Sequence, residues 1–131
     1  MLCLLGALGL PSVLDVAKSF LGIPYVGGTL ESDGEECLIV DTMGMDCTTF
    51  VELSVARFLA ARDSSFAFEQ HVQRLRYRHG EVDGYLSRLH YFTDWAERNV
   101  QGGVWRELGP EEDDGYMWRF DTLMLNYMSN H

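Results

Sequence analysis

The stretch Asp46-Cys47-Thr48-Thr49-Phe50 opens an apolar-periodic run that predicts a helix from Cys47 to about Arg62. Cys47 would lie in the first turn of this helix, directly after a carboxylate. The free N–H groups and the positive end of the helix dipole favour a thiolate over a thiol there. Asp46 is the predicted N-cap, accepting a hydrogen bond from the N–H of Thr48 or Thr49. This run is the predicted centre of both the core and the chemistry.

Cys47 has a second interpretation, because most free cysteines are small buried hydrophobic residues. The Asp46 carboxylate also opposes thiolate formation, so a catalytic Cys47 would need a histidine partner or oriented backbone donors. The predicted core face of the helix comprises Phe50, Val51, Val55, Phe58 and Leu59.

Other periodic segments predict helices on both sides of this one. A short helix follows Ser12, its predicted N-cap, and ends before Gly22 and Pro24. Two more are expected at about 65–78, burying Phe68, Val72 and Leu75, and at about 83–99, with Leu86 and Leu89 on one side. Residues 37–40 are predicted to form a short buried strand, and a weaker apolar–polar alternation predicts another strand at 104–108. Residues 1–10 fit a clipped export segment or a buried strand equally, and 116–131 fit helix or strand equally.

The bulk composition narrows the class of protein. A chain of 131 residues with 47% hydrophobic residues is long enough for one folded domain. Twenty acidic and ten basic residues give a net charge of −10, and the arginines are scattered, which disfavours nucleic-acid binding. The apolar residues 1–10 are too few for an integral membrane span.

The cysteines and histidines show few of the spacings that are typical of known sites. Cys3, Cys37 and Cys47 are too few for a disulfide scaffold and have no metal-ligand spacing, so no metal or organic cofactor is expected. His90 and Asp94 are four residues apart, so a helix would place them on one face, where the carboxylate could orient the imidazole.

The alternative for that pair is a surface ion pair of little energetic value. Its neighbours Arg88, Tyr91 and Trp95 are side chains that often line polar-ligand pockets, although aromatic stripes more often form core. His71 and His79 have no obvious partner and are expected to be solvated, and His131 is the last residue.

Several motifs in order resemble one family, the N-acetylmuramoyl-L-alanine amidase-like branch of the NlpC-type, papain-like cell-wall cysteine hydrolases of bacteria. The resemblance runs from about Val13 to His131. The motifs are FLGIPY at 20–25, GTLE at 28–31, DCTTFVE at 46–52, RYR at 76–78, GYLSRLHY at 84–91, DW at 94–95 and YMS at 127–129.

The resemblance implies a helix-dominated α+β fold, the N-terminal portion of a papain-like domain whose sheet is incomplete in this chain. It implies one domain over residues 1–131, with 11–131 matching the family, and a location in the cell envelope or periplasm. The implied substrate is a muropeptide, cut between the lactyl group of N-acetylmuramic acid and L-alanine.

The resemblance also implies roles for individual residues. Cys47 matches the nucleophile, Tyr25 the tyrosine beside it, and Asp46 the acidic residue before it. The implied substrate-binding residues are Tyr25, Asp46, Thr48, Arg88, Tyr91, Asp94 and Trp95.

The family's base histidine lies on a strand after the matched region. This chain is therefore expected to be an incomplete copy, truncated at His131; otherwise the base is one of its four histidines, with His90 the best candidate. The rival function is a muropeptide- or partner-binding domain that keeps the cleft without the chemistry, and a third is an acidic helical interaction protein.

Overall fold

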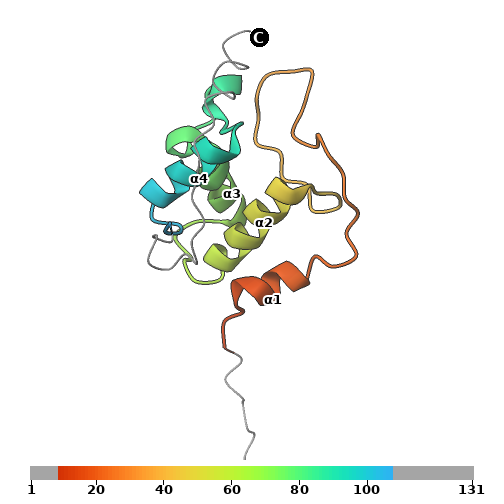
Figure 1. Cartoon of the computed structure of the whole chain (residues 1–131), viewed down its shortest axis with the longest axis vertical. Helices are drawn as coiled ribbons and strands as arrows, with labels where there is room; N and C mark the ends of the chain where they lie inside the picture. The colour runs from red at the N-terminus through yellow and green to blue at the C-terminus, as the bar shows by residue number, and fades with distance from the viewer. Residues whose placement is uncertain (1–8, 108–131) are drawn as a thin grey trace, which may run out of the picture.

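The computed structural model describes residues 9–107, and four α-helices organise that part of the chain (Figure 1). They are α1 (Val13–Lys18), α2 (Cys47–Ala60), α3 (Phe68–Arg76) and α4 (Phe92–Gln101). Two short 3₁₀ turns, η1 (Arg78–Gly80) and η2 (Tyr85–Ser87), connect α3 to α4. Residues 9–107 contain no extended strand, only two isolated bridges, Tyr25 with Met45 and Tyr77 with Arg88.

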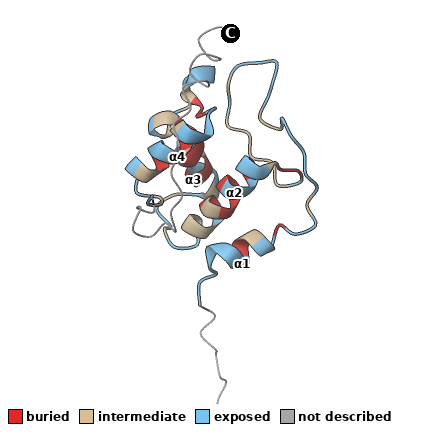
Figure 2. Ribbon diagram, viewed as in Figure 1, coloured by how far each residue is buried: buried red, intermediate tan, exposed pale blue. Residues whose placement is uncertain are grey.

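The core forms where α2 packs on α3 and, less extensively, on α1. In Figure 2 the buried residues gather on the facing sides of these helices. The buried hydrophobic cluster consists of Val16, Phe20, Met45, Leu53, Ala56, Val72 and Leu75. No helix among residues 9–107 is long and apolar enough to cross a bilayer.

The predicted start of α2 is confirmed. Asp46 is its N-cap: the carboxylate accepts a hydrogen bond from the N–H of Thr49 at 2.8 Å, and the Thr49 hydroxyl accepts one from the N–H of Asp46 at 2.9 Å. This reciprocal pair is a capping box. The predicted first helix is also confirmed, since Ser12 caps α1 in the same way through Asp15.

The predicted core face of α2 is wrong in part. Phe50 and Val51 are 36% and 39% exposed, whereas Glu52 is buried and lies on the side that packs against α3. The reason is a long-range partner: Arg76 on α3 neutralises Glu52, so a carboxylate occupies a position that periodicity reserves for an apolar side chain.

The predicted helix at 83–99 is broken in the structure. Gly84 has a φ of +70°, η2 follows it, and α4 begins only at Phe92. Between them, Arg88 bridges to Tyr77 in extended conformation, and the N–H of Leu89 donates to the carbonyl of Arg76 at 2.9 Å. This extended link displaces the helix, and Leu86, predicted to face the core, is 82% exposed.

The helix predicted at 65–78 is confirmed as α3, with Val72 and Leu75 fully buried and Phe68 packed against the core. The predicted strand at 37–40 is wrong: these residues form no ladder, and Cys37 is exposed.

Residues 104–107 also form no strand. Leu108, Cys3, the expectations for 116–131 and His131 lie outside the described residues, as does most of the segment 1–10, whose Leu10 is exposed.

Candidate active site

Cys47 is the first residue of α2, and its side chain is exposed. The interpretation of Cys47 as a buried hydrophobic residue is therefore wrong. The Asp46 carboxylate turns away to Thr49, whose N–H and hydroxyl it binds at 2.8 and 2.9 Å. The capping box thus orients the turn that presents the thiol, and it engages the carboxylate in that turn.

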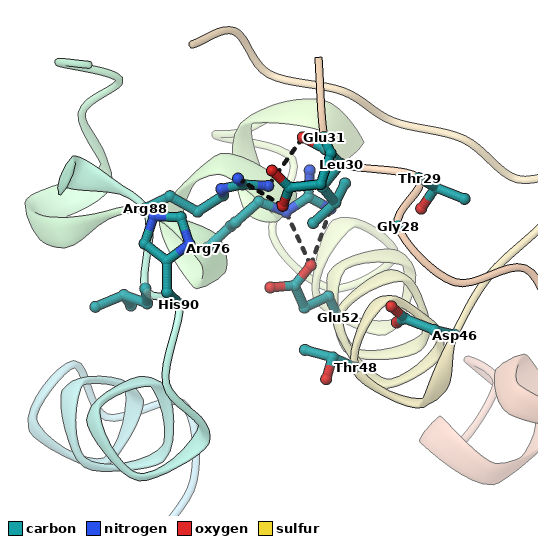
Figure 3. Close-up of a pocket in the computed structure, with 11 residues that line it drawn as sticks. Gly28, Thr29, Leu30, Glu31, Asp46, Thr48, Glu52, Arg76, Arg88 and His90 are labelled. Carbon is teal, nitrogen blue, oxygen red and sulfur yellow. Dashed lines mark hydrogen bonds and ion pairs between the residues drawn. The ribbon is translucent and has the colours of Figure 1, made fainter. Parts of the chain in front are cut away.

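A polar pocket of about 250 Å³ lies beside this turn (Figure 3). The exposed Cys47 lies between two of the lining residues, Asp46 and Thr48. The walls come from four places in the sequence: residues 28–31, the first turns of α2, the end of α3, and residues 88–90. The lining residues are Gly28, Thr29, Leu30, Glu31, Asp46, Thr48, Glu52, Arg76, Arg88, Leu89 and His90.

A buried ion pair lies in the wall between α2 and α3. The Nε and Nη2 atoms of Arg76 each lie 2.9 Å from one carboxylate oxygen of Glu52, and both side chains are almost completely buried. Burial raises the pKa of Glu52, and the adjacent Arg76 guanidinium opposes that rise. Arg76 also donates from Nη1 to the carbonyl of Ile39.

Arg88 forms the wall opposite α2, and its guanidinium contacts the chain at 30–36. Nη1 donates to the carbonyl of Leu30 at 2.9 Å, Nη2 pairs with Glu31 at 3.0 Å, and Nε lies 3.4 Å from a carboxylate oxygen of Glu36. Arg88 is only 5% exposed. Nη1 and Nη2 thus donate hydrogen bonds within the protein, whereas Nε is buried at ion-pair distance from Glu36 without a hydrogen bond.

His90 lines the pocket from an extended segment rather than from a helix. Its Nε2 lies 2.7 Å from the carbonyl oxygen of Tyr85, and its ring stacks on the Tyr85 ring with centroids 4.1 Å apart. A carbonyl only accepts, so this contact selects the tautomer with hydrogen on Nε2 and leaves the lone pair on Nδ1.

The predicted pairing of His90 with Asp94 is wrong. Because α4 begins two residues after His90, the two side chains do not share a helix face. Asp94 instead binds Arg78 and Arg98, and the Arg78 hydrogen bond holds the pKa of Asp94 below its usual range.

Cys47 itself and the remaining predicted site residues lie outside the pocket lining. Tyr25 and Tyr91 are 74% and 49% exposed, and the backbone of Tyr25 bridges to Met45 just before α2. Trp95 is buried core, 4.8 Å from the ring of Trp105. His79 is exposed as predicted, at a positive φ of 56°.

His71 was expected to be solvated and is instead 5% exposed, with its ring against that of Phe66. The correction follows from its position on the face of α3 that also buries Val72 and Leu75.

Sequence reasoning missed two pocket-lining residues, Glu52 and Arg76. No local sequence signal identified Glu52, because its neighbours three and four residues away on the buried side of α2, Thr49 and Ala56, are seen to be buried only in the structure. A carboxylate on the buried side of a helix requires a cationic partner, and that partner is Arg76 on α3.

Residues 15–125 match the family model AmiA-like, described as N-acetylmuramoyl-L-alanine amidase-like. The chain belongs to this family, since the match covers most of its length. No curated protein sequence matches the chain.

Among solved structures, the chain is similar to an N-acetylmuramoyl-L-alanine amidase from Bacteroides uniformis ATCC 8492, with 43% identity and a TM-score of 0.64 over 69% of this chain and 38% of that one. A Bacteroides fragilis structure, provisionally named a xylanase, has 42% identity and a TM-score of 0.64 over 70% of this chain and 41% of that one. The chain thus spans about two fifths of the length of these relatives.

Proposed function

We propose that this chain supplies the nucleophile of a bacterial cell-wall amidase that cleaves the bond between N-acetylmuramic acid and L-alanine in muropeptides. The observation that carries the proposal is the exposed Cys47, held at the first position of α2 by a capping box and flanked by two pocket-lining residues. Membership of the amidase-like family supports the same reaction class.

The proposed chemistry is acyl transfer through a thioester. The Cys47 sulfur attacks the lactyl carbonyl carbon, and the backbone N–H at the helix start helps to hold the oxyanion. The C–N bond then breaks, and the L-alanine amine leaves with a proton from a histidine. Water hydrolyses the thioester and restores the thiol, so one water is consumed for each amide cleaved.

His90 is the proposed base among the described residues. Its ring lines the same pocket as Asp46 and Thr48, and the contact to Tyr85 leaves Nδ1 to accept a proton. Tyr25, Thr48 and Tyr91 are proposed to contact substrate. Figure 3 shows that His90 and Thr48 come from two different segments, with the His90 ring beside Arg88 and Thr48 below Glu52 in this view.

The proposed function carries with it a fold type and a location. We propose that the described helices belong to a helix-dominated α+β domain of the papain-like, NlpC type, in which a cysteine begins the central helix. We propose a location in the cell envelope or periplasm, because that is where the proposed substrate occurs.

Alkylation by iodoacetamide at pH 6 tests the nucleophile, because only a thiolate reacts. Cys47 and Cys37 are both exposed, so a difference in their rates reports activation rather than access. We expect Cys47 to react at least about tenfold faster, and Cys47→Ser to lose at least about 10⁴-fold in muropeptide hydrolysis. Cys37→Ser is the matched control and should keep full activity. Equal labelling of the two thiols would refute an activated Cys47.

The second candidate is a muropeptide-binding domain of the same fold without the chemistry. His90 favours it, because the contacts that fix its ring within residues 9–107 are the Tyr85 carbonyl and the Tyr85 ring rather than a carboxylate. Calorimetric binding of muramyl dipeptide (N-acetylmuramoyl-L-alanyl-D-isoglutamine) without release of L-alanyl-D-isoglutamine, together with slow alkylation of Cys47, would select this candidate.

A further inference from the structure

The segment between α1 and α2 forms a loop that is closed at its base. The N–H of Val26 donates to the carbonyl of Met45 at 3.1 Å, and the N–H of Met45 donates to the carbonyl of Pro24 at 3.3 Å. Cys47 follows two residues later. We call residues 26–44 the wall loop, because residues 28–31 form one wall of the pocket.

Side chains from the end of α3 and from Arg88 hold the wall loop at three points. Arg88 binds the carbonyl of Leu30 and the carboxylate of Glu31. The Tyr77 hydroxyl lies 2.6 Å from Glu36 and 3.0 Å from the carbonyl of Cys37. Arg76 donates to the carbonyl of Ile39.

The bridge between Tyr77 and Arg88 places these anchors side by side. It brings residues 76–77 next to residues 88–89, and the N–H of Leu89 donates to the carbonyl of Arg76. In Figure 3 the Arg88 and Arg76 guanidinium groups lie next to each other beneath Leu30 and Glu31. Between its hydrogen-bonded ends, the wall loop is thus held to the rest of the fold by these side chains.

The geometry points to Arg88 as a positioning residue: it holds the wall loop in place as one side of the pocket and sets the affinity for muropeptide without touching it. The inference rests on the proposed function for the identity of the ligand. Three observations support it. Arg88 is 5% exposed, its Nη1 and Nη2 donate to Leu30 and Glu31 while Nε lies 3.4 Å from Glu36, and the Leu30 acceptor is the backbone carbonyl of the loop itself.

A planar guanidinium is required for this role. Its nitrogens point in fixed, diverging directions and reach Leu30, Glu31 and Glu36 together, whereas a lysine ammonium is a single point donor. Arg88→Lys therefore keeps the charge and most of the side chain but cannot satisfy all three acceptors.

Proteolysis by a glutamate-specific protease measures how often the wall loop opens, because Glu31, Glu35 and Glu36 lie within it. For Arg88→Lys we expect cleavage after these residues to rise about tenfold, the factor that corresponds to one net hydrogen bond. Cleavage after Glu69, in α3, should not change. Calorimetry with muramyl dipeptide should show about tenfold weaker binding in the same variant.

Two further variants keep the test decisive. Arg62→Lys is the matched control, because Arg62 is exposed at the end of α2 and packs over Phe58, away from the pocket. Glu36→Gln weakens the anchors of both Arg88 and Tyr77 from the loop side without altering either residue, and, with cleavage followed after Glu31 and Glu35, it should reproduce both effects if Arg88→Lys does not fold.

The outcomes separate the alternatives. Weaker binding with unchanged loop cleavage would overturn the proposal and make Arg88 a direct substrate contact. Faster cleavage with unchanged affinity would also overturn it, since the wall loop would then not shape the binding site. If the unaltered chain fails to bind muramyl dipeptide, the proposed function is refuted, while the cleavage pattern still decides whether Arg88 holds the loop.

Discussion

The two sides of the pocket are built in opposite ways. On one side, the start of α2 is set by contacts between residues three apart, Asp46 and Thr49. On the other side, the wall loop is set by contacts between residues far apart in sequence: 37 positions for Arg76 with Ile39 and 58 for Arg88 with Leu30. Local contacts present the thiol, and long-range contacts shape the space beside it.

The two sides of the pocket therefore depend to different degrees on the rest of the fold. A capping box forms as soon as its helix forms, because both partners belong to one turn. The arginine anchors form only when α2, α3 and the wall loop have assembled, and they leave a buried charge if one partner is lost. We therefore expect mutations on the two sides to differ in how much they lower the free energy of unfolding and in how far from the mutated residue their effects extend.

The largest effect is expected for Arg76→Met, which leaves Glu52 buried without a partner. Breaking such a pair costs about 3–5 kcal/mol, so the free energy of unfolding in urea should fall by that amount. Arg74→Met is the matched control, since Arg74 lies on the same helix but is exposed. The double variant Glu52→Leu with Arg76→Met should recover part of the loss, and a double variant no better than Arg76→Met alone would count against an ion-pair explanation.

A smaller effect is expected for Asp46→Ala, which removes one half of the capping box. The loss should be about 1 kcal/mol, measured by urea unfolding. Asp46→Asn should lose much less, because an asparagine side-chain oxygen can accept the same hydrogen bond from Thr49. If the two substitutions are equally costly, the negative charge of Asp46 and not its hydrogen bond stabilises the start of α2.

The smallest effect on the free energy of unfolding is expected for Asp94→Asn. Asp94 is a partly exposed residue of α4 that binds Arg78 of η1. Because the pKa of Asp94 is lowered in the folded state, mainly by its hydrogen bond to Arg78, ionised Asp94 adds stability at pH values above its unfolded pKa. That contribution disappears as pH falls through the lowered folded pKa. Both partners are partly exposed, so it should stay below about 1 kcal/mol.

The measurement for Asp94 is the difference in urea midpoint between the unaltered chain and Asp94→Asn at pH 6, 4 and 3. This difference should narrow toward pH 3, and at pH 6 it should narrow in 1 M salt. A difference that is constant with pH would show that Asp94 stabilises the protein by packing alone.

The parts of the site that sequence could predict are those with local causes. Asp46 as N-cap and the helix that buries Val72 and Leu75 both follow from the spacing of neighbouring residues, whereas spacing alone left open whether Cys47 is buried or exposed. The His90 contact could not be predicted, because helical spacing to Asp94 assumes a helix that Gly84 and the extended Arg88 interrupt.

The inward position of Glu52 also escaped prediction, for a different reason. Periodicity assigns faces by hydrophobicity and therefore turns Phe50 and Val51 inward, but the pairing of Glu52 with Arg76 determines which face of α2 is buried. The partner lies 24 residues away on another helix, and no local pattern identifies it.

The closed base of the wall loop has a consequence for how this architecture can diversify. The hydrogen bonds between Val26, Met45 and Pro24 fix the entry and exit of the loop, and its outermost residues, 32–34, are exposed and lie between the anchor points at Glu31 and Glu36. Chain closure becomes only slightly less favourable as a loop lengthens. Insertions at this tip can therefore add new recognition surface during evolution, or in an engineered variant, while the sulfur of Cys47 stays where α2 puts it.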